Sequence, residues 1–167
     1  MQKVFHRRFS TELGELELAA TPDALVGLEF INDPEEQPPA PHASPDASAL
    51  LDLAEREIRE YLAGTRRTFT VPLDLSVGTE FQQEVWQGLQ GIGYGETLSY
   101  HELACCVGHP RAARAVGNAN HRNPISIIVP CHRVIAADGS LGGYGGKVWR
   151  KQFLLDLESQ HPVTPLS

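Results

Sequence analysis

The sequence predicts two domains, a small α/β domain over residues 1–78 and a mainly helical domain with a helix-turn-helix over residues 79–167. Three observations lead to this fold class. Charged and apolar residues alternate near the start of the chain, which is typical of a half-buried strand. Two helix-capping boxes lie in the second half, and such boxes mark helix starts. A chain of 167 residues also suits one domain or two small domains that share an interface.

The first half predicts a small sheet and one helix. Residues 15–18 alternate strictly between glutamate and leucine, and residues 25–30 follow as a second strand. Residues 34–45 contain five prolines and predict a surface loop. Apolar residues then recur at helical spacing over residues 51–61, and Gly64 provides a stop. Nothing in this half points to chemistry.

The second half predicts a series of helices. A Thr-Glu-Phe-Gln capping box at 79–82 begins the first of them, because the threonine hydroxyl and the glutamine side chain satisfy each other's free amides. A second box at 99–102 begins a helix that ends at Gly108. Pro110 suits the first position of the next helix, which continues over residues 111–119. Two short helices joined by a tight turn form a helix-turn-helix pattern.

The end of the chain combines a buried segment, a glycine-rich loop and a last helix. Residues 125–129 form a short buried run that leads into Pro-Cys-His-Arg-Val at 130–134. Glycines over residues 139–146 permit close backbone approach to a flat ligand, although they are equally typical of a hinge. The last helix is expected to place three apolar side chains on one face: Trp149, Phe153 and Leu157.

The formal net charge of −7 argues, taken alone, against a nucleic-acid partner. The acidic residues are concentrated in the first half, however. Residues 1–78 hold 7 basic and 14 acidic side chains, whereas residues 79–167 hold 7 of each. Residues 100–122 contain three arginines and one glutamate. A DNA-binding face is expected there, with weak electrostatic attraction.

Cysteine content and hydropathy predict a reducing, cytoplasmic compartment. The three cysteines are an odd number and argue against a disulfide framework. Residues 1–10 mix basic and apolar side chains and lack the core of a signal peptide. No apolar run approaches the length of a membrane span, so no membrane partner is expected.

Cys131 is the sharpest candidate for chemistry. A thiol attacks only as a thiolate, and neighbouring bases promote that form. The alternative is that Cys131 is a small buried apolar residue, as many single cysteines are. His132 cannot easily fold back onto its immediate neighbour, so a water or a third group would have to carry the proton. Glu158, considered alone, would be a solvated carboxylate at a helix end.

Two other features have structural and functional interpretations. Cys105 and Cys106 lie about 100° apart on a helix and cannot both face one metal ion, so we expect core packing and no metal site. The helix at 111–119 carries mostly small side chains besides Arg114. It suits either tight packing in a core or close approach to a DNA groove, and its composition does not decide between them.

Four motifs together identify a family. Pro-Cys-His-Arg-Val stands at 130–134, Tyr-Gly-Glu-Thr-Leu-Ser-Tyr at 94–100, Ala-Ala-Arg-Ala-Val-Gly at 112–117 and Asn-Pro at 123–124. In these motifs and their spacing the chain resembles the O6-alkylguanine-DNA alkyltransferase family, the methylated-DNA–protein-cysteine methyltransferases. The resemblance is dense over residues 79–160. It implies a ribonuclease H-like N-terminal domain and a winged helix-turn-helix C-terminal domain.

The resemblance also implies a reaction: one irreversible transfer of an alkyl group from O6-alkylguanine, and from O4-alkylthymine, to the protein itself after base flipping. Cys131 would accept the alkyl group. His132 would act through a water as the base, and Glu158 would orient His132. Asn123 would bond the active-site turn, and Tyr100 would donate a proton or a hydrogen bond to the leaving guanine.

The same resemblance implies contacts to the base and the duplex. The base pocket would include Tyr100, Val134, Tyr144 and Gly145. Arg114 would fill the space left by the flipped nucleotide, and small residues would let its helix lie close in the groove: Ala112, Ala113, Ala115 and Gly117. The implied partner is double-stranded DNA containing O6-alkylguanine, bound by a monomer without a cofactor, and cooperative binding stays open.

Two other functions compete with this one. A cysteine hydrolase that uses Cys131 and a distant histidine would turn over esters or peptides. A DNA-binding module without chemistry would keep its activity after Cys131→Ala.

Overall fold

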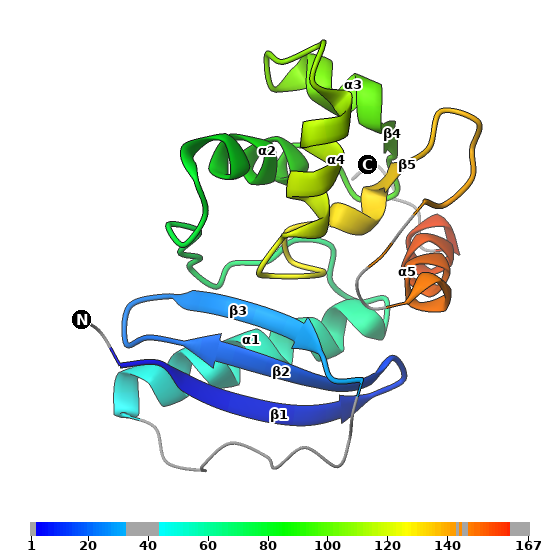
Figure 1. The fold of residues 1–167 in the computed structure, drawn as a ribbon. Coiled ribbons are helices and arrows are strands. Elements are labelled where there is room, and N and C mark those ends of the chain that lie inside the picture. Colours follow the sequence, from blue (N-terminus) through cyan, green and yellow to red (C-terminus); the bar gives the residue numbers. More distant parts are fainter. Residues whose placement is uncertain (1–2, 33–43, 143, 145–146, 161–167) are drawn as a thin grey trace, which may run out of the picture. The chain divides into compact units, whose positions relative to one another are not determined.

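The computed structural model describes residues 3–32, 44–142, 144 and 147–160 (Figure 1). It contains two compact units, which are described separately. The first comprises Met1–Leu75 together with Pro124–Ile128, and the second comprises Ser76–Asn123 together with Val129–Ser167. The first unit is a small sheet with one helix and the second is mainly helical, so the predicted fold class is confirmed. Each unit draws on two stretches of chain. The domain boundary after residue 78 stays a prediction.

The sheet of the first unit is antiparallel, with strand order β1-β2-β3. Its strands are β1 (Phe5–Thr11), β2 (Gly14–Ala20) and β3 (Leu25–Phe30). Alternation places Leu16, Leu18 and Ala20 of β2 in the core, as expected. The sequence analysis missed β1, because His-Arg-Arg at 6–8 interrupts the apolar pattern.

One helix, α1 (Pro45–Leu62), packs on this sheet (Figure 1). Ser44 caps it by accepting a hydrogen bond from the backbone N of Ala47 at 3.2 Å. Pro45 occupies the first turn, so the predicted loop ends one residue too late, and residues 34–43 of that loop lie outside the described residues. The expected apolar face is buried: Leu51, Ala54, Ile58 and Tyr61.

The second unit contains α2 (Glu80–Gln90), α3 (Tyr100–Cys106), α4 (Ala113–His121), the single turn η1 (Cys131–Arg133) and α5 (Val148–Gln160). Two short strands, β4 (Leu98–Ser99) and β5 (Val134–Ile135), pair in parallel. Both predicted capping boxes are present, at the starts of α2 and α3. The described residues contain no helix with the length and apolar character of a membrane span.

The start of α4 differs from the prediction. The helix begins at Ala113, and Pro110 lies in a turn that the backbone N of Ala112 closes on the carbonyl of His109 at 2.9 Å. Ala112 is the N-cap residue and has no side-chain oxygen, so the start of α4 has no side-chain cap. The helix continues to His121, past the predicted end at Ala119.

The buried face of α5 also differs from the prediction. Trp149 is 50% exposed, although it was expected to share a core face with Phe153 and Leu157. The buried positions are Arg150, Lys151, Leu154, Leu157 and Glu158. Apolar periodicity missed this face because three of its five members are charged, and buried charged groups need partners that a helical pattern does not reveal.

Candidate active site

Cys131 begins η1, the tight turn that follows the buried segment 125–129. Its backbone N donates to the carbonyl of Val129 at 2.8 Å, and its side chain is buried. Burial raises the pKa of the Cys131 thiol, whereas a hydrogen bond with Asn123 and the charge of Lys151 lower it by less. The thiol is therefore protonated at rest, and a base has to remove its proton before it can attack.

His132 and Glu158 form a contact inside the protein. His132 Nε2 lies 2.7 Å from Glu158 Oε2, and both side chains are buried. A carboxylate only accepts hydrogen bonds, so Nε2 carries the proton and Nδ1 has a free lone pair. That Nδ1 is buried and has no hydrogen-bond partner among the described residues. The structure thus brings together two residues that the sequence analysis placed in one relay, and their catalytic roles stay predictions.

Arg133 completes this group, and the sequence analysis assigned it no role. Its Nε donates to Glu158 Oε1 and its Nη2 to Glu158 Oε2, each at 2.9 Å. Burial alone would raise the pKa of Glu158, but hydrogen bonds and charges from His132 and Arg133 hold it well below its usual range. Glu158 is therefore a carboxylate throughout the physiological range.

Two asparagines near the end of α4 hold the turn that carries Cys131. Asn123 Nδ2 donates to the carbonyl of Val129 at 2.7 Å, and Asn120 Nδ2 donates to the carbonyl of Cys131 at 3.4 Å. The sequence analysis expected the first contact and missed the second. Asn120 is 2% exposed. The sequence offered one sign of its role, namely that a polar residue occupies the buried face of α4.

Tyr100 and Tyr144 lie within electrostatic range of Cys131. Burial raises the pKa of both phenols, and proximity to Cys131 raises it further. Both therefore stay protonated near neutral pH and can act as donors. The Tyr100 hydroxyl is buried and has no hydrogen-bond partner among the described residues. Val134 is buried directly after η1, and Gly145 lies outside the described residues.

Lys151 is a buried cation that the sequence analysis missed. Its Nζ donates to the carbonyl of Val134 at 2.6 Å and also to the carbonyl of Leu141. Burial lowers the pKa of Lys151 to about 8, and Cys131 opposes that shift. The lysine connects α5 to β5 and to the following loop, and it places a titratable cation near the thiol.

The helix-turn-helix exposes part of α4. Arg114 and Ala115 are exposed, whereas Val116 is buried against the rest of the unit. Ala112, Ala113 and Gly117 are half-buried. A Cβ at 117 would lie 3.4 Å from the Tyr100 ring, an ordinary contact distance, while the exposed positions are accessible to a partner.

Cys105 and Cys106 are both exposed, so the expectation that they pack in the core is wrong. They lie on the outward face of α3, where Cys105 Sγ is 3.6 Å from His101 Nε2. No group of three or more histidine, cysteine or acidic residues in the described part of the chain could hold a metal ion.

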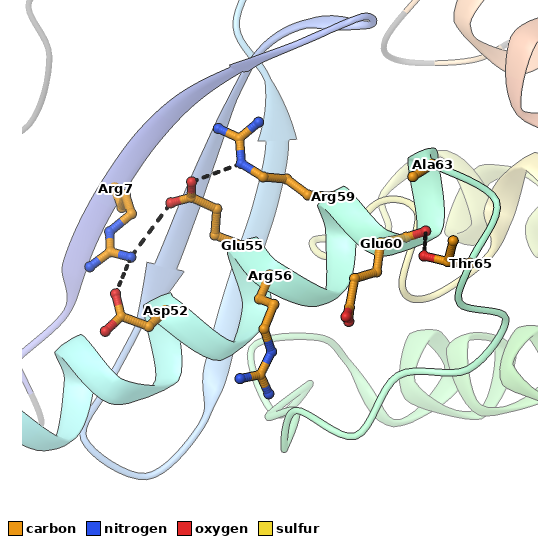
Figure 2. A pocket seen from close by; sticks show the side chains of 8 residues that line it. All are labelled: Arg7, Asp52, Glu55, Arg56, Arg59, Glu60, Ala63 and Thr65. Carbon is orange, nitrogen blue, oxygen red and sulfur yellow. Dashed lines mark hydrogen bonds and ion pairs between the residues drawn. The ribbon is translucent and has the colours of Figure 1, made fainter.

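The first unit has a charged pocket of about 490 Å³ along α1 and β1. Figure 2 shows Arg7, Asp52, Glu55 and Arg59 in one ion-pair cluster, with Arg56 pointing away from it. Its lining residues include no cysteine. The Cys131 thiol, His132, Arg133 and Glu158 belong to the second unit.

The second unit thus combines a buried thiol, next in sequence to a histidine–carboxylate pair, with a helix-turn-helix, a motif of many DNA-binding proteins. Comparison with known proteins identifies the family. Residues 80–160 match the DNA-binding domain of 6-O-methylguanine DNA methyltransferase, and residues 4–75 match its ribonuclease-like domain. The chain belongs to the 6-O-methylguanine DNA methyltransferase family.

Curated relatives match along nearly the whole chain. The methylated-DNA–protein-cysteine methyltransferase of Mycobacterium bovis is 45% identical over 98% of both chains. The constitutive enzyme of Bacillus subtilis is 42% identical over 92% of this chain and 94% of its own. Mycobacterium tuberculosis OGT in complex with DNA superposes with a TM-score of 0.82, at 45% identity and 93% coverage of both chains.

Proposed function

We propose that this protein repairs DNA directly, by moving one methyl or larger alkyl group from O6-alkylguanine in duplex DNA to Sγ of Cys131. It acts on O4-alkylthymine in the same way. The observation that carries this proposal is the placement of the buried Cys131 thiol next in sequence to a histidine whose Nε2 is held 2.7 Å from Glu158. Membership of the family supplies the substrate class.

The reaction begins with base flipping, because guanine O6 lies inside the duplex stack and a buried thiol cannot reach it there. His132 Nδ1 takes the proton of Cys131 through a water molecule. The thiolate then attacks the alkyl carbon, so that an S–C bond forms while the C–O6 bond breaks. Tyr100 gives a proton or a hydrogen bond to the departing guanine. The proton that His132 took from Cys131 passes to the Tyr100 phenolate in the first case and to guanine in the second, so the charges balance.

The product is a thioether, which is a poor leaving group. No group near Cys131 in the described structure is a nucleophile suited to cleave it, so each molecule acts once. Arg114 and the small residues of α4 would act at the duplex, with Arg114 stabilising the flipped state. The protein acts as a cytoplasmic monomer in this proposal.

Intact-mass analysis tests the proposal. A short duplex with one O6-methylguanine, in excess, should add one methyl group to each protein, and peptide mapping should place it on Cys131. Cys131→Ser should gain no mass, while Cys105→Ser should gain one methyl group as the wild type does. Repeated turnover, or a methyl group on Cys105 or Cys106, would contradict the proposed acceptor.

A further inference from the structure

The buried Arg133 side chain binds the Glu158 carboxylate. Two of its guanidinium nitrogens donate to the two carboxylate oxygens at 2.9 Å each, and its third nitrogen, Nη1, donates to the carbonyl of Ile92 at 2.6 Å. The side chain is 7% exposed. A bidentate contact of this kind fixes both the position and the plane of a carboxylate. We propose that Arg133 is a positioning residue that keeps the His132 imidazole neutral, and so able to accept a proton, by neutralising Glu158.

The need for such a residue follows from the chemistry of the pair. A buried carboxylate bonded to an imidazole favours the imidazolium. An imidazolium carries a proton on each ring nitrogen and cannot accept another. Glu158 therefore orients His132 usefully only if its negative charge is balanced by a different cation. Arg133 is suited to this, because a guanidinium stays charged at every relevant pH.

The charges around His132 are consistent with that balance. Glu158 and Lys151 face it from α5, and Arg133 faces it from η1. Burial lowers the pKa of His132 most, Glu158 raises it, and Arg133 and Lys151 lower it again, with a net lowering. Without Arg133, Lys151 is the remaining cation among the described residues that lowers the pKa of His132, and Lys151 loses its own charge near pH 8.

A further contact fixes the same carboxylate. The backbone N of Gly95, in the turn before β4, donates to Glu158 Oε1 at 3.1 Å. Glu158 is thus bonded from two segments: that turn, and η1 through His132 and Arg133. Position is therefore supplied by several groups, whereas the balancing charge in direct contact comes from Arg133. Substitutions at 133 can separate the two contributions.

The direct test is a titration of the His132 ring nitrogens by NMR in protein without DNA. Arg133→Gln should raise the pKa of His132 by about one unit or more. Arg133→Lys keeps the charge but loses the two-pronged geometry, so its His132 should titrate close to the wild type. Equal shifts in the two variants, or none in either, would overturn the proposal.

Single-turnover rates against pH give a second readout. Arg133→Gln should lose methyl transfer at neutral pH and recover much of it at alkaline pH, where His132 is neutral again. A loss of the same size at every pH would mean that Arg133 only supports the fold, and would also overturn the proposal.

Glu158→Gln is a second variant that tests the same charge balance if Arg133→Gln does not fold. With Arg133 present and the carboxylate absent, His132 should titrate below the wild type, and Arg133→Gln/Glu158→Gln should bring it back toward the wild-type value. An unchanged His132 pKa in Glu158→Gln would count against the charge balance. The inference rests on the proposed role of His132. The NMR titration of His132 and the mapping of the methyl group to Cys131 are separate measurements, so failure of one can be told from failure of the other.

Discussion

Asn123 Nδ2 lies 2.7 Å from the carbonyl oxygen of Val129, two residues before Cys131. That carbonyl also accepts from the backbone N of Cys131 at 2.8 Å, so one acceptor receives donors from both the asparagine and the backbone of Cys131. Asn123 follows Arg122, the C-cap residue of α4. The position of the thiol is therefore tied to the helix that carries Arg114.

Asn123→Ala should lower the stability by about 0.5–1.5 kcal/mol, because it removes one hydrogen bond from a carbonyl that still accepts from the backbone N of Cys131. It should also slow alkyl transfer, since the turn that places Cys131 is less constrained. Thermal unfolding and the single-turnover rate with free O6-alkylguanine base measure the two effects. Asn118→Ala, an exposed asparagine on α4, is the matched control and should change neither. Equal behaviour of the two variants would remove Asn123 from the site.

Glu158→Gln should slow transfer at neutral pH by about 100 to 10,000-fold, the usual range for a general-base system, with little change in DNA affinity. Removing one partner of a buried ion pair also costs about 3–5 kcal/mol, so the rate has to be measured well below the new Tm. An unchanged rate in folded Glu158→Gln would show that the contact with His132 is structural only.

The contrast between what sequence predicted and missed here has a physical basis. The capping boxes at Thr79 and Ser99 join residues three apart, so local sequence specifies them. Arg133 bonds the carbonyl of Ile92, 41 residues away, and no local pattern encodes that pairing. Lys151 is buried because two backbone carbonyls accept from it, which periodicity cannot show. Cys131, His132 and Glu158 were found through a motif and a resemblance, not through periodicity.

The three thiols should differ sharply in accessibility. Cys105 and Cys106 are exposed and Cys131 is buried, with burial raising its pKa. A bulky, charged thiol reagent should therefore label Cys105 and Cys106 rapidly and Cys131 only slowly in the native protein. Timed labelling with peptide mapping measures the order, and unfolding in denaturant should make all three equivalent. Early labelling of Cys131 would show that its site opens readily.

Lys151 should make stability depend on alkaline pH. Its folded pKa is about 8, whereas the unfolded value is about 10.4. Between these pH values the unfolded chain binds more protons than the folded protein, so the free energy of unfolding increases as the pH rises. Denaturant unfolding at several pH values should show this rise in the wild type relative to Lys151→Met. Parallel curves for the two proteins would mean that Lys151 titrates normally.

Arg114 is exposed on α4 among small residues, and two roles at the duplex predict different results. Losing a phosphate contact lowers affinity for all DNA and reduces the salt slope by about one unit. Losing a residue that fills the vacated stack mainly slows repair in duplex DNA, because a free base needs no flipping. Arg114→Ala should therefore slow transfer from duplex O6-methylguanine far more than transfer from free O6-alkylguanine.

Arg111→Ala, an exposed arginine outside the helix, is the matched control and should slow neither substrate selectively. Both single-turnover rates are measured after circular dichroism has confirmed folding, and equal slowing on the two substrates by Arg114→Ala would assign it to the fold or the pocket instead.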